Sequence, residues 1–202
     1  MLVKMYEFAS KESPDGMSVH MTDILRASVV FLHAAFEEML RSLILATYPI
    51  AEASVLNEIP LAGVNKSGRP EKFLLGDLSR FRNKTVEQVI DLSLQEHVSR
   101  LTFNNRGDLL HVIRSLGLRD SHVVKLMPAL DAMLRRRHQI VHRGDRPVAE
   151  DQRWIRATSL SSKHVRSWIK ATTNFVAIAL TGAVMRKFIN PNKVTTKKTR
   201  SR

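Results

Sequence analysis

Residues 121–144 read SHVVKLMPALDAMLRRRHQIVHRG. Apolar side chains recur in this stretch with the period of an α-helix that has one buried face. The expected core positions are Val124, Leu126, Met127, Leu130, Met133, Leu134 and Val141. Ser121 is a suitable N-cap, and Gly144 is a suitable residue to end the helix. The sequence therefore predicts a long helix whose last turns carry arginines and histidines.

Similar periodicity on both sides of this stretch predicts four further helices. They run from Met17 to Tyr48, from about Thr85 to Leu101, from a cap at Asn104 or Asn105 to Gly117, and from Ser162 to Phe188. No segment shows strand-like alternation with paired turn signals. We therefore expect an all-α fold, an antiparallel helical bundle of about five helices.

The composition indicates one domain. A chain of 202 residues, 44% hydrophobic and 25% charged, is long enough for one buried core and short for two. We expect an N-terminal extension at 1–16, a helical domain at 17–189 and a disordered basic tail at 190–202. Because cysteine is absent, disulfide and thiolate chemistry are excluded, and a reducing compartment is compatible. The most apolar late run, 175–185, is too short to span a bilayer, so we expect a cytoplasmic protein without a membrane partner.

The charge indicates a polyanionic partner. The net charge of +13 favours nucleic acid, because neutralising phosphates releases condensed counterions. Residues 49–75 form a basic connecting stretch rich in Pro and Gly, which we expect to be a mobile loop. The cations expected to bind RNA are Lys66, Arg69 and Lys72 in this loop and Lys197 and Lys198 in the tail.

The end of the predicted motif helix combines groups that suit phosphodiester chemistry. His138 and His142 are one helical turn apart on the same face, and Arg137 is next to His138. Imidazole can accept and donate protons at neutral pH, and a guanidinium can donate two hydrogen bonds to a phosphate. RNA cleavage without a metal needs a base, an acid and positive charge near the phosphoryl oxygens. This set of side chains could provide all three.

The pattern Arg137-His138-x-x-x-His142, followed by Arg143-Gly144-Asp145, resembles the motif of the HEPN superfamily. In that motif, four to six residues separate an Arg from a His. The sequence RRRHQIVHRGD is most similar to the motif of the RiboL-PSP-HEPN branch. The segment FLHAAFEEML, from Phe31 to Leu40, resembles the first helix of that branch, with its acidic residue at Glu37.

The resemblance implies a metal-independent endoribonuclease that needs no cofactor and leaves a 2′,3′-cyclic phosphate and a 5′-hydroxyl. His142 would be the general acid or base, Arg137 the phosphate clamp, and His138 an orienting group or second acid or base. The family further implies a homodimer with the site at its interface. It also implies a toxin or anti-phage effector restrained by an antitoxin or another regulatory protein. The supporting residues would be Glu37, Arg135, Arg136, Arg143 and Asp145.

Several alternatives remain open at this point. Arg135 and Arg136 also satisfy the permitted spacing to His142, so any of the three arginines could contact phosphate. Glu37 could orient an Arg or His of the motif helix, or it could belong to a solvated or ion-paired line with His33 and Arg41.

Two other functions compete with the ribonuclease. A zinc-dependent hydrolase could use the two histidines with Asp131 or Asp145, although a His-Glu-x-x-His signature is absent. A non-catalytic helical module could use the same basic face to bind RNA or another protein. Trp154 and Trp168 could stack on bases, but packing is the favoured interpretation for both.

Overall fold

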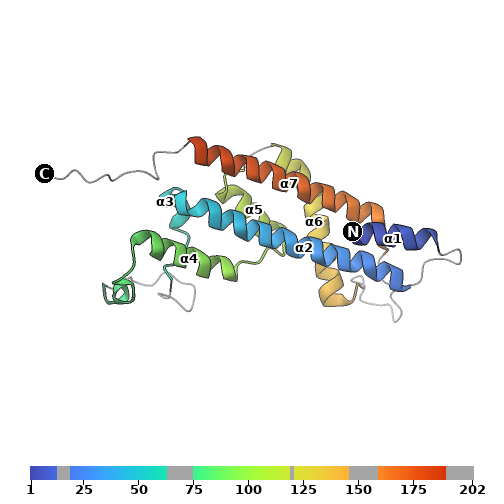
Figure 1. Cartoon of the computed structure of the whole chain (residues 1–202), viewed down its shortest axis with the longest axis horizontal. Coiled ribbons are helices and arrows are strands. Elements are labelled where there is room, and N and C mark those ends of the chain that lie inside the picture. The colour runs from blue at the N-terminus through green and yellow to red at the C-terminus, as the bar shows by residue number, and fades with distance from the viewer. Residues whose placement is uncertain (13–18, 63–74, 119–120, 146–158, 190–202) are drawn as a thin grey trace. The chain divides into compact units, whose positions relative to one another are not determined.

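A computed structural model of the chain describes residues 1–12, 19–62, 75–118, 121–145 and 159–189 (Figure 1). Within these ranges the α-helices are α1 (Leu2–Lys11), α2 (Val19–Thr47), α3 (Ala53–Leu56), α4 (Val86–Arg100), α5 (Arg106–Ser115), α6 (Ser121–Arg143) and α7 (Ser162–Ile189). Two 3-10 helices, η1 (Tyr48–Ile50) and η2 (Leu75–Phe81), complete the regular structure. The all-α fold class is confirmed, with no strand in the described part of the chain.

Local sequence signals explain most of the helix boundaries. Thr85 and Gln88 form a reciprocal capping box at the start of α4. The side chain of Asn105 accepts from the amide of Asp108 at 3.0 Å, so α5 begins at this cap. Gly117 and Gly144, which follow α5 and α6, have φ values of 59° and 55°. Because L side chains rarely adopt this conformation, the two glycines end their helices as predicted.

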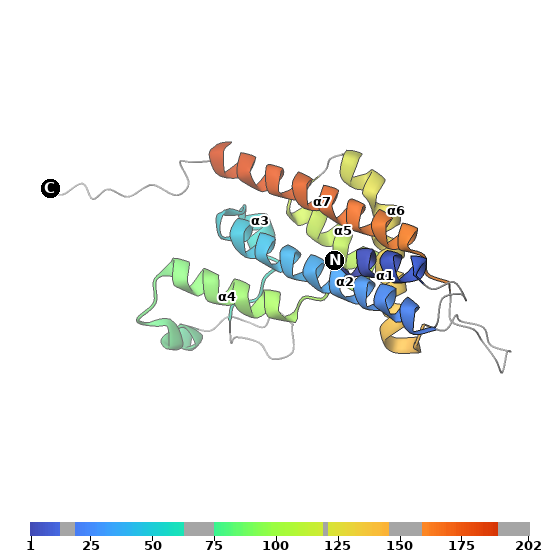
Figure 2. The same cartoon turned by 45° about the vertical axis from the view of Figure 1, so that its right-hand side comes forward.

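The contacts divide the chain into two compact units. The first contains residues 1–39 and 103–178, and therefore α1, α5, α6 and the first parts of α2 and α7. Its core includes an edge-to-face contact between Phe36 and Phe175, whose ring centroids are 5.3 Å apart. Within this unit, α1 is antiparallel to α2, whereas α7 has the same direction as α2 (Figures 1 and 2). The candidate motif lies entirely in this unit.

The second unit contains residues 40–102 and 179–202. Within it, α4 packs against η1. Arg41 donates to the carbonyl of Leu101 at 3.2 Å, which attaches the end of α4 to α2. The hydroxyl of Ser93 accepts from the amide of Ala62 at 3.0 Å and donates to the carbonyl of Val89. A buried serine thus satisfies its polar atoms while it fixes the segment that follows α3.

Helix α1 was not predicted from the sequence, which indicated only an extension at 1–16. Its residues Val3 and Tyr6 are buried in the first unit. Glu7 pairs with Arg166 of α7, with 2.8 Å between Oε1 and Nε. A helix of ten residues is marginal alone, so burial and this ion pair stabilise it against α7.

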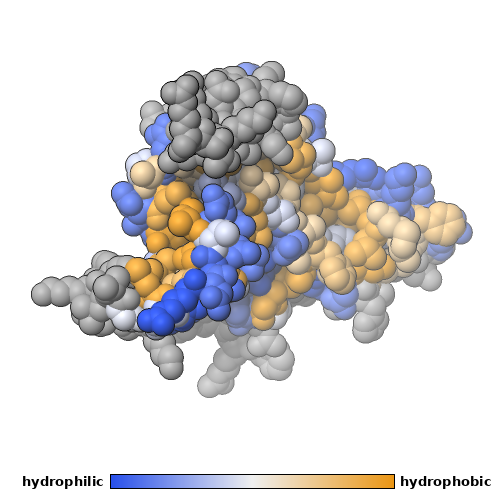
Figure 3. Space-filling model, turned by 60° about the vertical axis from the view of Figure 1, so that its left-hand side comes forward, coloured by the Kyte–Doolittle hydropathy of each residue, from blue (hydrophilic) through white to orange (hydrophobic). Residues whose placement is uncertain are grey.

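Two of the core predictions for α6 were wrong. Val124 is 67% exposed and Val123 is buried instead, while Val141 is also exposed. Phe31 on α2 is exposed as well. Figure 3 shows hydrophobic residues among hydrophilic ones on one face of the surface. Single exposed apolar residues are normal in soluble proteins, because a protein lacks enough polar area to cover itself.

Some predictions fall outside the described residues. These are the loop cations Lys66, Arg69 and Lys72, the tail cations Lys197 and Lys198, the tail itself and Trp154. Trp168 is buried and stacks with His164 at a centroid distance of 6.2 Å, as the packing interpretation predicted. Among the described helices, none is long and apolar enough to cross a membrane.

Candidate active site

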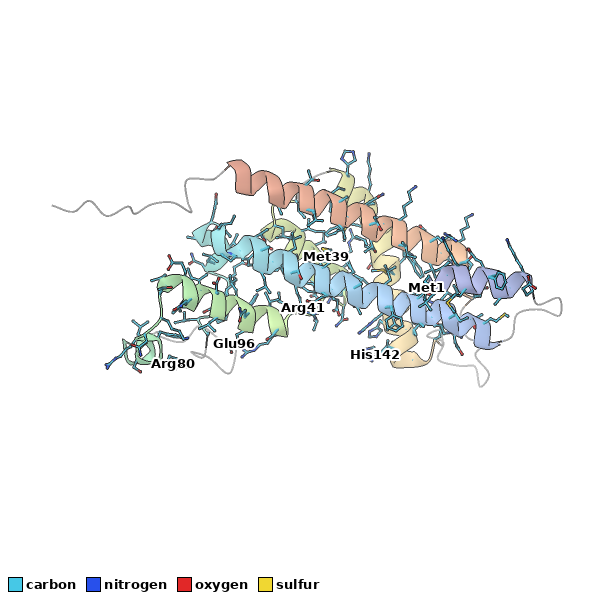
Figure 4. All side chains as sticks on the ribbon, in the orientation of Figure 1. Met1, Met39, Arg41, Arg80, Glu96 and His142 are labelled. Atoms are coloured by element: carbon cyan, nitrogen blue, oxygen red, sulfur yellow. The ribbon has the colours of Figure 1, made fainter. Side chains whose placement is uncertain are left out.

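The last turns of α6 carry the motif side chains, and Figure 4 labels His142 at this end of the helix. Leu130, Met133 and Leu134 are buried along one face of α6. Arg137 continues this line one turn further, whereas His138 and His142 are rotated from it toward solvent. The helix therefore places the arginine at the margin of the core and the imidazoles on its exposed side.

His138 and His142, the histidine pair, contact each other. Their ring centroids are 4.7 Å apart and their planes are inclined by 42°. Both residues are exposed. Two adjacent imidazoles can hold a proton on one ring and a free acceptor nitrogen on the other. The pair can therefore serve both proton-transfer roles at one phosphodiester.

The three consecutive arginines meet three different environments. The Arg135 side chain is 74% exposed and pairs with Asp131, one turn earlier, at 3.1 Å. The Arg136 side chain is only 8% exposed, and its Nη2 donates to Asp145 Oδ2 at 2.8 Å. Arg137 is half-buried and donates from Nη1 to Asn104 Oδ1 at 3.2 Å. Burial thus leaves Arg135 and Arg137 as the arginines of this set with substantial access to solvent.

Arg137 is held by a segment that α2 supports. The amide of Phe103, which precedes Asn104, donates to Glu37 Oε1 at 3.2 Å. The carbonyl of Phe103 lies 3.3 Å from His33 Nε2, which must donate, because a carbonyl only accepts. His33 Nδ1 lies 3.7 Å from Glu37 Oε2. Through these contacts Glu37 fixes the segment that orients Arg137.

These contacts also bear on the two interpretations of Glu37. His33 is buried, with 1% exposure, so a solvated polar line of His33, Glu37 and Arg41 is wrong. The separation of His33 and Glu37 fits the ion-paired form of that interpretation. The hydrogen bond of Glu37 to Phe103 adds an indirect link to the motif helix, through the backbone and Asn104.

Asp145 follows α6 and is buried, with 1% exposure. Its Oδ2 accepts from Arg136 and from Nε of Arg26 on α2, each at 2.8 Å. We call Arg26, Arg136 and Asp145 the Asp145 cluster. Burial lowers the pKa of Arg136 below its ordinary value, and the charge of Arg26 adds to this, while Asp145 opposes it. Burial also lowers the pKa of Arg26, but hydrogen bonds to Asp145 and Asp23 outweigh it and raise the pKa overall.

The carboxylates considered as zinc ligands are already engaged. Asp145 accepts from two arginines, and Asp131 pairs with Arg135. In the described ranges, no group of three or more His, Cys, Asp or Glu side chains could hold a metal ion. The histidine pair therefore lacks a third protein ligand from these residues.

Two residues of this region were missed by the sequence analysis. Arg26 shares one face of α2 with His33 and Glu37, at intervals of seven and four residues. That spacing could have indicated a polar face that contacts other elements. Asn104 was considered only as a possible helix cap, and nothing in the sequence links it to Arg137. Arg143, a predicted supporting residue, is exposed.

Comparisons with known proteins identify the family that carries this arrangement. A family model described as RiboL-PSP-HEPN matches residues 6–179, which include the second half of α1, the histidine pair and the Asp145 cluster. Comparisons with curated proteins and with solved structures found no match. HEPN-type domains are often ribonucleases. Because the match covers most of the chain, the protein belongs to the RiboL-PSP-HEPN family.

Proposed function

We propose that this protein is a metal-independent endoribonuclease of the HEPN type. One imidazole of the histidine pair takes the proton of a ribose 2′-hydroxyl, and the 2′-oxygen attacks the adjacent phosphorus. The bond from phosphorus to the 5′-oxygen then breaks, and an acid protonates that oxygen. The products are a 2′,3′-cyclic phosphate and a 5′-hydroxyl. His142 is the principal acid or base, and His138 is the orienting group or second acid or base.

The observation that carries this proposal is the contact of two exposed imidazoles beside an oriented guanidinium. His138 and His142 have ring centroids 4.7 Å apart, and Arg137, the residue that precedes His138, is held by Asn104. A guanidinium fixed before the reaction stabilises developing phosphoryl charge without reorganising. Half-burial strengthens its field relative to that of a solvated arginine. These features favour Arg137 over Arg135 as the phosphate clamp.

The proposed substrate is RNA, and the proposed active form is a homodimer. The net charge of +13 supports binding to a polyanion. His138 and His142 are exposed on one helix end, so a second copy could close a cleft over them. We place the active site at this dimer interface.

A biological role as a toxin or anti-phage effector, restrained by an antitoxin or regulatory protein, extends the proposal and rests on family membership. If the protein has this role, expression of the wild type should arrest cell growth, and expression of a variant without His142 should not.

The test is cleavage of total RNA and tRNA in EDTA, with analysis of the fragment ends. We compare the wild type with His142→Ala and with the control His122→Ala, which removes an exposed imidazole at the other end of α6. Wild type and His122→Ala should give cyclic-phosphate ends, and His142→Ala should give no fragments while it keeps RNA affinity within about fivefold. RNA binding without cleavage by the wild type would instead favour the non-catalytic module.

A further inference from the structure

The ion pair of Arg136 with Asp145 brackets the histidine pair in the chain. Arg136 precedes His138 by two residues, and Asp145 follows His142 by three. The amide of Asp145 donates to the carbonyl of Gln139 at 3.1 Å, and Arg136 Nη1 lies 3.4 Å from Gln139 Oε1. The segment that carries both imidazoles is thereby closed at each end by contacts to the same carboxylate and the same glutamine.

The bracketed turn has little burial of its own. Residues 141–144 are all exposed, whereas Arg136 and Asp145 on either side are buried. The last turn of a helix also lacks partners for its final carbonyls, so it frays unless other contacts hold it. The ordered position of His142 therefore depends strongly on the Asp145 cluster.

The backbone at Asp145 indicates that the cluster imposes this geometry. Asp145 has a φ of 65°, in the left-handed region, directly after Gly144 at 55°. A residue other than glycine is strained in this region, and it keeps this backbone conformation only where surrounding contacts hold it there. Here the contacts are the hydrogen bonds that Oδ2 accepts from two arginines and the hydrogen bond that the Asp145 amide donates to the carbonyl of Gln139.

Arg26 connects this turn to a different helix. Its Nε donates to Asp145, and its Nη1 donates to Thr22 at 2.8 Å and to Asp23 at 2.7 Å. Three acceptors thus fix the guanidinium between α2 and the end of α6. Arg26 is the member of the cluster that lies outside α6 and the turn after it.

We propose that Arg26 and Asp145 are positioning residues, which hold the His138/His142 turn of α6 against α2 without contacting substrate. The kinetic part of this inference rests on the proposed ribonuclease function, whereas the structural part does not. Loss of Arg26 removes one of two arginines from Asp145 and lets the strained turn relax. The imidazoles then sample more orientations, and fewer of them suit proton transfer.

The experiment uses Arg26→Gln, the milder Arg26→Lys, and Arg166→Gln as a matched control. Arg166 also joins two helices through a carboxylate, Glu7, but it lies on α7. Each full-length protein, labelled in its histidine rings, is examined by NMR and then assayed for RNA cleavage well below its melting temperature. Single His→Ala variants assign the ring signals of His138 and His142, and His111 on α5 is the reference.

For Arg26→Gln we expect shifted and broadened ring signals of His138 and His142, with the His111 signal unchanged. The kcat should fall by about 10- to 100-fold and KM should stay within about twofold. Arg26→Lys should recover part of both effects, and Arg166→Gln should match the wild type. Two results would refute the proposal. The first is a folded Arg26→Gln variant whose imidazole signals and kcat match those of the wild type. The second is a change in signal that is spread equally over all histidines, because this would indicate general destabilisation. If the wild type cleaves no RNA, the ribonuclease proposal fails and the ring signals still decide the positioning role.

Discussion

At the scale of single residues, successive arginines of one helix have different physical environments. Helical geometry rotates Arg135, Arg136 and Arg137 by about 100° each. Arg136 is thereby buried against Asp145, Arg137 lies half-buried beside Asn104, and Arg135 is exposed with Asp131. Charge alone therefore does not decide which arginine can contact a phosphate.

Substitution of the two accessible arginines should separate their roles. We predict that Arg137→Ala lowers kcat for RNA cleavage by about 100-fold, because it removes an oriented donor from the developing phosphoryl charge. Arg135→Ala should lower kcat by less than about fivefold, because an exposed, solvated ion pair contributes little. Steady-state kinetics on a short RNA substrate measures both. The reverse order would assign the phosphate contact to Arg135, which lies on the same side of α6 as His142.

At the scale of elements, α1 is attached to α7 by a salt bridge that titrates. The hydrogen bond from Arg166 is the main cause that lowers the pKa of Glu7 below its ordinary value of 4.5. Because the folded state holds the carboxylate in its charged form, the pair contributes stability above pH 4.5. This contribution is lost as the pH falls through the lower pKa of the folded protein.

The pH dependence can be measured with Glu7→Gln. We predict that its Tm lies below that of the wild type near neutral pH, and that the gap closes as the pH falls through the lowered pKa of Glu7 in the folded protein. Arg166→Gln should show the same closing gap, since it removes the other partner of the pair. The double variant should then reveal a coupling energy near neutral pH that vanishes in acid. A gap that is independent of pH would show that the Glu7 carboxylate makes no titrating contribution to stability.

At the scale of the whole molecule, the proposed homodimer would make the active site depend on the assembly of two copies. If two copies form the cleft, an inactive partner should impair an active one. We predict that mixed dimers of wild type and His142→Ala, co-expressed with different tags, have less than half the activity of wild-type dimers. Analytical ultracentrifugation establishes the dimer, and cleavage by the purified mixed species measures the effect. Half activity in mixed dimers would indicate that each copy carries a complete site.

The sequence by itself determined the helical class, the ends of α6 and the residues of the motif. Apolar periodicity, caps and glycines act locally, within a few residues, so they can be recognised without knowledge of the fold. Two separate segments, at 31–40 and 134–145, also sufficed to indicate the family, which the match over residues 6–179 confirms. Helix α1 was missed because its two buried residues, Val3 and Tyr6, give too weak a pattern over ten positions.

Only the tertiary structure decided which polar residues support the motif. Arg26 and Asp145 are 119 residues apart in the chain, and Asn104 is 33 residues from Arg137, yet each pair is in hydrogen-bond contact. Such pairs depend on how α2, α5 and α6 pack, and no local pattern encodes that packing. Arg136, the middle of three identical residues, is likewise buried because it lies on the side of α6 that faces Arg26 and Asp145. Sequence therefore identified the motif residues, whereas packing selected the residues that hold them in place.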